Sequence, residues 1–146
     1  IGGSVFRSRY RDLYGEWRDR SHDNQYLLTA VIGYQPSERW TFSGRWNVVG
    51  GRPYTPFDAA LSDWYGDGIL DTLRTNGARD PAYHTLNLRV DGRFSIGGTR
   101  LVTYLSVWNV YNRENVWFHY WDDTEDREAT FEQWRILPIA GIRYEF

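Results

Sequence analysis

The strict alternation of apolar and polar side chains over long stretches limits the fold of this chain more than any other feature. Between Tyr83 and Ile96, one set of alternate residues is mostly apolar. The other set contains Arg89, Asp91 and Arg93. Successive side chains of a β-strand point to opposite faces, so the pattern predicts a strand with one apolar and one ionic face. Soluble strands are usually about 5–6 residues long, whereas a tilted strand needs about 9–11 residues to cross a bilayer. The length favours a transmembrane strand.

Two further stretches, 24–35 and 39–51, show the same alternation, which Leu27 and Val31 blur in the first. Aromatic residues lie near the ends of their apolar faces. Tyr and Trp rings favour the two membrane–water interfaces, where barrel proteins carry aromatic girdles. An Arg on the lipid face of a barrel costs about 2–4 kcal/mol at the midplane, so the arginines are expected to face the interior.

This alternation assigns each residue of the expected strands to one of two faces. The residues expected to face lipid are Tyr26, Leu28, Ile32, Tyr34, Trp40, Phe42, Trp46, Leu86, Leu88, Val90, Phe94, Ile142, Tyr144 and Phe146. The residues expected to face the lumen are Arg39, Arg45, Asn47, Asn87, Arg89, Asp91 and Arg93.

Turn residues divide the chain into antiparallel hairpins. Short turns are expected at Gln35–Glu38 and Gly97–Thr99, and long polar connections at Asp12–Asp23, Arg52–Ala82 and Asp122–Glu128. About six strands are predicted, with boundaries good to about 2–4 residues. They span residues 3–11, 24–35, 39–51, 83–96, 100–120 and 129–146. Outer-membrane barrels also combine short turns with long loops, but they need at least about eight strands. The expected fold is therefore an all-β antiparallel segment of a larger transmembrane barrel.

Composition excludes several other classes of protein. The chain of 146 residues has no Cys, which excludes disulfides, thiolate catalysis and Cys-based zinc sites. Its net charge of −2 offers no basic surface for nucleic acid. The three His lie on separate segments without a zinc-protease pair, and no nucleophile-elbow motif is present, so no enzymatic activity is expected. No apolar run is long enough for a transmembrane helix, and the absence of Met predicts a mature or excised piece of a longer chain.

Four segments, in order, resemble the C-terminal end of TonB-dependent receptors of the bacterial outer membrane. Val49–Pro56 (VGGRPYTP) is similar to the "SGxPYTP" segment of that family, and Ser106–Asn115 (SVWNVYNREN) to its "NLFNRxN" segment. Gly141–Phe146 (GIRYEF) resembles the closing strand, and Asp63–Gly68 (DWYGDG) lies where some members have an "NGDG" loop. The resemblance covers most of the chain from about residue 24 to the end.

This resemblance implies a barrel of about 22 strands, of which residues 1–146 would be the C-terminal part. It also implies an N-terminal plug domain and a TonB box, both missing from this sequence, and energy supplied by TonB from the inner membrane. The implied location is the outer membrane of a Gram-negative-type bacterium. The implied activity is uptake of a scarce bulky solute, of the siderophore, vitamin or glycan class.

Three smaller sets of residues are candidate sites. Ile142, Tyr144 and Phe146 resemble the C-terminal signal that the barrel assembly machinery binds, although lipid contact alone also accounts for them. Aromatic residues on the long connection are candidates for solute contact, or for packing on neighbouring loops, together with an arginine. This set is Arg52, Tyr54, Phe57, Trp64 and Tyr65. Asp63, Asp67 and Asp71 have calcium-loop spacing, but Tyr65 and Arg74 replace two ligands, so a solvated turn is the simpler interpretation and no cofactor is expected.

An alternative from another class is a soluble β-barrel or sandwich that binds a small apolar ligand. It uses the same alternation with the apolar face turned inward. It would require the chain to close on itself and to stay in water without detergent.

Overall fold

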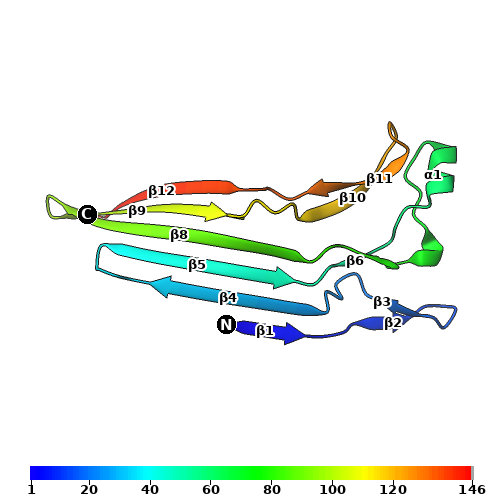
Figure 1. Ribbon diagram of the computed structural model, residues 1–146, viewed down its shortest axis with the longest axis horizontal. Coiled ribbons are helices and arrows are strands. Elements are labelled where there is room, and N and C mark those ends of the chain that lie inside the picture. The colour runs from blue at the N-terminus through cyan, green and yellow to red at the C-terminus, as the bar shows by residue number, and fades with distance from the viewer. Residues whose placement is uncertain (146) are drawn as a thin grey trace.

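The computed structural model describes residues 1–145, and a six-stranded antiparallel sheet is its main element (Figure 1). The order of strands across the sheet is β1-β4-β5-β8-β9-β12. Their bounds are β1 Gly2–Val5, β4 Tyr26–Tyr34, β5 Trp40–Val49, β8 Tyr83–Ile96, β9 Thr99–Trp108 and β12 Leu137–Glu145. The predicted all-β antiparallel class is confirmed.

The prediction of one continuous strand is wrong for three of the six ranges. Residues 3–11, 100–120 and 129–146 each contain two separate strands, because one part of each joins the main sheet and the other forms a small hairpin. These extra strands are β2 Arg9–Arg11, β10 Val116–Asp122 and β11 Arg127–Glu132. Between β9 and β10, Asn109 and Asn112 have left-handed backbone angles, with φ of 52° and 57°, and these interrupt the strand.

The long connections also contain short elements that the sequence pattern did not predict. These are β3 Trp17–Asp19, β6 Pro53–Tyr54, α1 Ala59–Tyr65, the 3-10 helix η1 Thr72–Arg74 and β7 Ala78–Arg79. Asp58 caps α1 by accepting a hydrogen bond from the Leu61 amide, and Gly66 ends the helix in the left-handed conformation. Neither helix is long and apolar enough to cross a membrane within the described part of the chain.

The two ends of the sheet differ in how they connect the strands. At the turn end, residues 35–39 join β4 to β5, and Gly97 and Gly98 join β8 to β9 with φ of 58° and 86°. At the loop end, the connections are residues 6–25, 50–82 and 109–136 (Figure 1). The three small two-stranded sheets, β2–β3, β6–β7 and β10–β11, and both helices therefore lie at the loop end (Figure 1).

Strand register gives the sheet one apolar and one polar face, because residues paired directly across antiparallel strands lie on the same side. Leu88 pairs with Gly44 on one neighbour and Val107 on the other, and Val90 pairs with Phe42 and Leu105. Arg89, one residue along, pairs with Ser43 and Ser106. All the described residues predicted to face lipid fall on the apolar face, and Phe146 lies outside the described residues.

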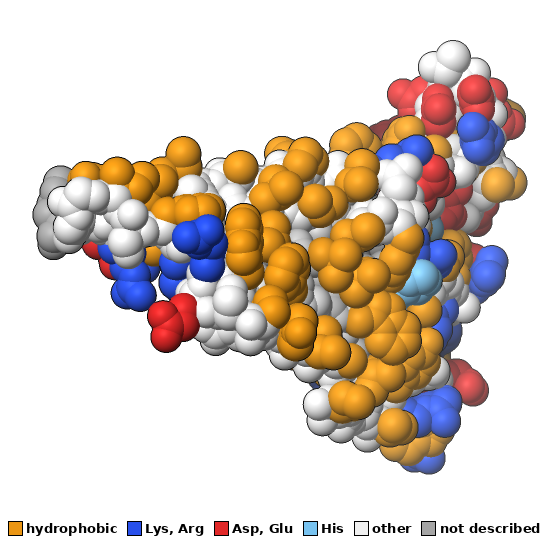
Figure 2. Space-filling view, turned by 60° about the vertical axis from the view of Figure 1, so that its left-hand side comes forward, with side chains coloured by type: hydrophobic (Ala, Val, Ile, Leu, Met, Phe, Trp, Pro, Cys, Tyr) orange, Lys and Arg blue, Asp and Glu red, His pale blue; other side chains and the backbone are white. Residues whose placement is uncertain are grey.

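The apolar face is not covered by any other part of the described chain. Trp121, 9% exposed, is the single large apolar side chain that is buried among residues 1–145, and it lies in the hairpin at the loop end. Ile32, Phe42 and Leu88 on the sheet are all exposed. Figure 2 shows apolar side chains spread over much of the visible surface. The six strands therefore form an open sheet without a hydrophobic core of their own, and no closed barrel is formed by the described residues.

Candidate functional site

The polar face of the sheet carries hydrogen-bonded and charged side chains along its length. Arg89 forms a salt bridge of 2.6 Å with Asp91, and its guanidinium lies 4.0 Å from the centre of the Tyr104 ring. Arg93 Nη1 donates to Thr41 Oγ1 at 2.8 Å. These interactions join neighbouring strands β5, β8 and β9 on one side of the sheet.

Six of the seven residues predicted to face the lumen lie in the paired strands and on this polar face. The seventh, Arg39, lies outside the strands. Arg39 precedes β5, and its guanidinium lies 5.5 Å from the ring centre of Phe94, a residue of the apolar face. Arg39 is at the turn end, where a long side chain reaches around the end of the sheet.

An arginine at the loop end joins two of the long connections. Arg79 Nη2 lies 2.8 Å from Asp19 Oδ2 and 3.3 Å from Asp23 Oδ2, and its Nη1 donates to the carbonyls of Gly51 and Asp23. The Asp23 side chain is fully buried and also accepts a hydrogen bond from the Ser8 amide at 2.6 Å. A buried carboxylate needs such compensation, so this cluster holds residues 6–25 against residues 50–82.

A second cluster joins residues 50–82 to the β10–β11 hairpin through His119. Its Nε2 lies 2.6 Å from Asp80 Oδ1, and its Nδ1 lies 2.6 Å from Glu128 Oε1 without hydrogen-bond geometry. The Tyr54 ring stacks on the imidazole with 3.7 Å between ring centres. Burial, a hydrogen bond to Glu128 and the charges of Glu128 and Asp80 raise the pKa of Tyr54 to about 12. Carboxylates occupy both sides of the imidazole, so the geometry is that of a cross-link between loops.

The predicted solute-contact residues on this connection divide into two groups. Arg52 lies 3.5 Å from Asp80 and donates to the Trp117 carbonyl, while Tyr54 and Phe57 pack on His119 and Trp121. These three residues support the loops. Trp64 and Tyr65, in α1, are largely exposed and belong to neither cluster. The structure does not bring the five residues together.

The acidic residues of the calcium-loop pattern serve local turns. Asp63 lies within α1, Asp67 accepts from the Gly68 amide, and Asp71 caps η1 through the amides of Leu73 and Arg74. Within residues 1–145, no group of three or more His, Asp or Glu side chains is arranged to hold a metal ion.

The proposed C-terminal assembly signal lies on an edge strand. Ile142 and Tyr144 are exposed on the apolar face of β12, and β12 pairs with β9 alone among the described strands. The Tyr144 hydroxyl also hydrogen-bonds Thr99 Oγ1 at 2.7 Å. Phe146, the third residue of this set, lies outside the described residues.

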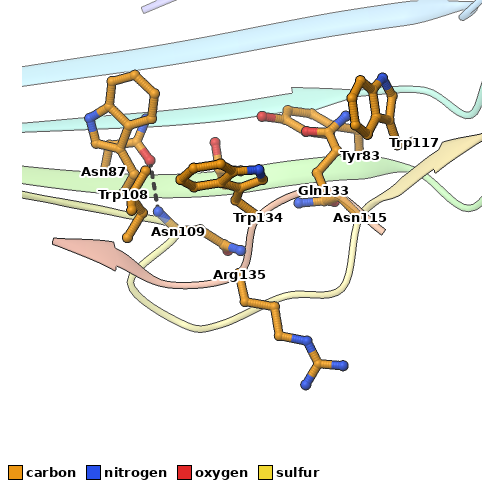
Figure 3. Close-up of a pocket in the computed structure, with 11 residues that line it drawn as sticks. Tyr83, Asn87, Trp108, Asn109, Asn115, Trp117, Gln133, Trp134 and Arg135 are labelled. Carbon is orange, nitrogen blue, oxygen red and sulfur yellow. Dashed lines mark hydrogen bonds between the residues drawn. The ribbon is translucent and has the colours of Figure 1, made fainter. Parts of the chain in front are cut away.

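A hollow of about 510 Å³ lies on the polar face at the loop end, between β8, β9 and the segment that leads into β12. Four aromatic residues and several amides line it (Figure 3). The aromatic residues are Tyr83, Trp108, Trp117 and Trp134; the amides are Asn87, Asn109, Asn115 and Gln133. Sequence patterns did not predict this site because its residues come from four separated segments. The pairing of aromatic and amide residues at 108–109 and 133–134 is the one local signal of it.

Comparison with protein-family models, with curated proteins and with solved structures gives no match for this chain.

Proposed function

We propose that this chain forms the C-terminal strands of an outer-membrane β-barrel that takes up a scarce bulky solute in a TonB-dependent manner. The observation that carries the proposal is the six-stranded sheet whose apolar face is exposed over its whole width. In water, such a face would be an aggregation liability, whereas lipid hydrocarbon would cover it without further protein.

The open edges of the sheet support a larger barrel. β1 pairs with β4 alone, and β12 with β9 alone, among the described strands. Unpaired backbone groups cost several kcal/mol each in hydrocarbon, so additional strands must pair with both edges if the sheet crosses a bilayer. The proposed partners are therefore lipid, the remaining barrel strands, a plug domain inside the barrel, TonB through that domain, and the barrel assembly machinery.

The difference between the two ends supports a direction across the membrane. Outer-membrane barrels have short periplasmic turns and longer extracellular loops. The turn end would therefore face the periplasm, and the loop end, with its two buried cross-links and its hollow, would face the exterior. The uptake class itself rests on the four motifs that resemble TonB-dependent receptors.

The alternative, a soluble β-barrel that binds an apolar ligand, requires the apolar set to pack inward. The exposure of Ile32, Phe42 and Leu88 weighs against it.

A pair of substitutions at adjacent positions tests the membrane orientation. Leu88→Arg should cost about 2–4 kcal/mol and block assembly, because it introduces a charge on the lipid-facing side. Arg89→Leu, on the polar face, should leave assembly largely intact. The measurement is the yield of the membrane-inserted, heat-modifiable form on unheated gels, with detergent extraction of washed membranes. Equal tolerance of both substitutions, or recovery of the wild-type protein in detergent-free buffer, would contradict the proposal.

A further inference from the structure

We propose that the hollow lined by Trp108, Trp117 and Trp134 binds a neutral, polyhydroxylated ligand, with the sugar rings of a glycan as the class. The inference rests on the proposed function, because the polar face is an aqueous interior only in a barrel. The volume of about 510 Å³ lies within the range of about 300–1,000 Å³ that is typical of small-molecule sites.

The tryptophan rings that line the hollow are exposed and have few ring partners in the protein. Trp134 is 75% exposed, and Trp108 is also exposed; neither has a ring partner among the described residues. Trp117 packs on Phe118 and Phe131 but remains half exposed. An exposed indole on a hydrated face gains by covering its apolar surface with a ligand. Sugar rings offer C–H faces of matching size.

Two amide side chains of the hollow have groups without protein partners. No hydrogen bond is found in residues 1–145 for the side-chain amide of Gln133. Asn87 uses its Oδ1 to accept from the Asn109 amide, which leaves its NH₂ group free. Hydroxyl groups both donate and accept, so they match this mixture of unpaired donors and acceptors.

The charge of the hollow argues against an anionic ligand. Its one cation is Arg135, which forms salt bridges of 2.5 Å with Glu114 and 3.1 Å with Glu132. Figure 3 shows the guanidinium of Arg135 directed away from the rings. Recognition of a carboxylate- or catecholate-rich metal chelate needs free arginine or lysine side chains, and this hollow offers none. The ligand class is therefore neutral.

The test is a binding measurement on the purified, detergent-solubilised protein with neutral oligosaccharides of glucose, mannose, galactose and xylose as probes. Saturable binding should change tryptophan fluorescence. Trp134→Ala should weaken it about three- to tenfold, since an aromatic stack contributes about that factor, and Trp134→Phe should restore most of the affinity. Trp17→Ala is the matched control: Trp17 of β3 is 59% exposed and lies outside the hollow, so its removal should leave the affinity unchanged.

Two results would overturn the inference and leave the transporter proposal standing. The first is that none of the neutral oligosaccharides binds, or that their binding is unaffected by Trp134→Ala. The second is that a ferric tris-catecholate or cyanocobalamin binds in a manner that depends on Trp134. Failure of the transporter proposal is seen separately, as protein that remains in solution without detergent.

Discussion

The main sheet and the loop end are stabilised in opposite ways. The sheet is held by backbone pairing, with its apolar side chains exposed on one face. The loop end contains the two fully buried side chains among the described residues, Asp23 and Ser62, and the buried Trp121. The ion pairs of Arg79 with Asp19 and Asp23, and the contacts of His119 with Asp80 and Glu128, join its three long connections. The part of the chain with irregular backbone is thus the part that packs against itself.

The two regions differ in what covers their side chains. Loops usually run over the surface and are more mobile than the elements that they connect. Here the Arg79 and His119 clusters link them, so the loop end has a defined shape before any ligand or neighbouring strand is present. The sheet, in contrast, leaves its apolar face to an external partner, which we propose to be lipid. Substitutions in the two regions should therefore have different consequences.

Removal of Arg79 should have the largest effect. Arg79→Ala leaves the buried Asp23 carboxylate without its cation, and breaking a buried pair costs about 3–5 kcal/mol. Hydrogen exchange at residues 19–25 and 50–54 should accelerate accordingly, while exchange in β8 should not change. Arg79→Lys keeps the charge but loses the fork that contacts four acceptors, so it should give an intermediate effect. Unchanged exchange in Arg79→Ala would show that the cluster does not hold the loops.

High pH should loosen the second cluster. The pKa of Tyr54 is about 12 in the folded protein against 10.0 for an unperturbed tyrosine, so folding favours the neutral phenol. The resulting stabilisation is fully present below pH 10 and is lost as the pH rises through 12. The difference in phenolate absorbance between wild type and Tyr54→Phe isolates this group. A titration midpoint near 10 would mean that Tyr54 is not buried against Glu128 in solution.

The smallest effect is expected for truncation on the apolar face. Leu88 is 44% exposed, and lipid would fill the space left by Leu88→Ala, so only a transfer term of about 1 kcal/mol is lost. Trp121→Ala at the loop end is the contrast, with an expected cost of about 3–5 kcal/mol for a buried large side chain. Free energies of unfolding in detergent or lipid measure both. A Leu88→Ala cost as large as that of Trp121→Ala would indicate that the apolar face packs against protein.

Much of the sheet could be predicted from local pattern, and little of the loop end could. Strand β8 agrees with its predicted range of 83–96, and the turn at Gly97 and Gly98 follows from residues that accept positive φ. The interruption of the strand at Asn109 and Asn112 was not predicted, because a polar residue within an alternating run does not by itself indicate a left-handed backbone. The hairpins β2–β3 and β10–β11 are short and pair only with themselves. Their separation from the sheet depends on contacts distant in sequence.

The alternation along the chain by itself determined which side chains share a face, since a strand turns successive residues to opposite sides whatever surrounds it. It also determined the all-β class and the contrast between short turns and long connections. Only the tertiary structure decided that Arg79 meets Asp19 and Asp23, that His119 lies between Asp80 and Glu128, and that three tryptophans from separate segments line one hollow. Those groups are brought together by strand order and register, and no local pattern of residues encodes such distances.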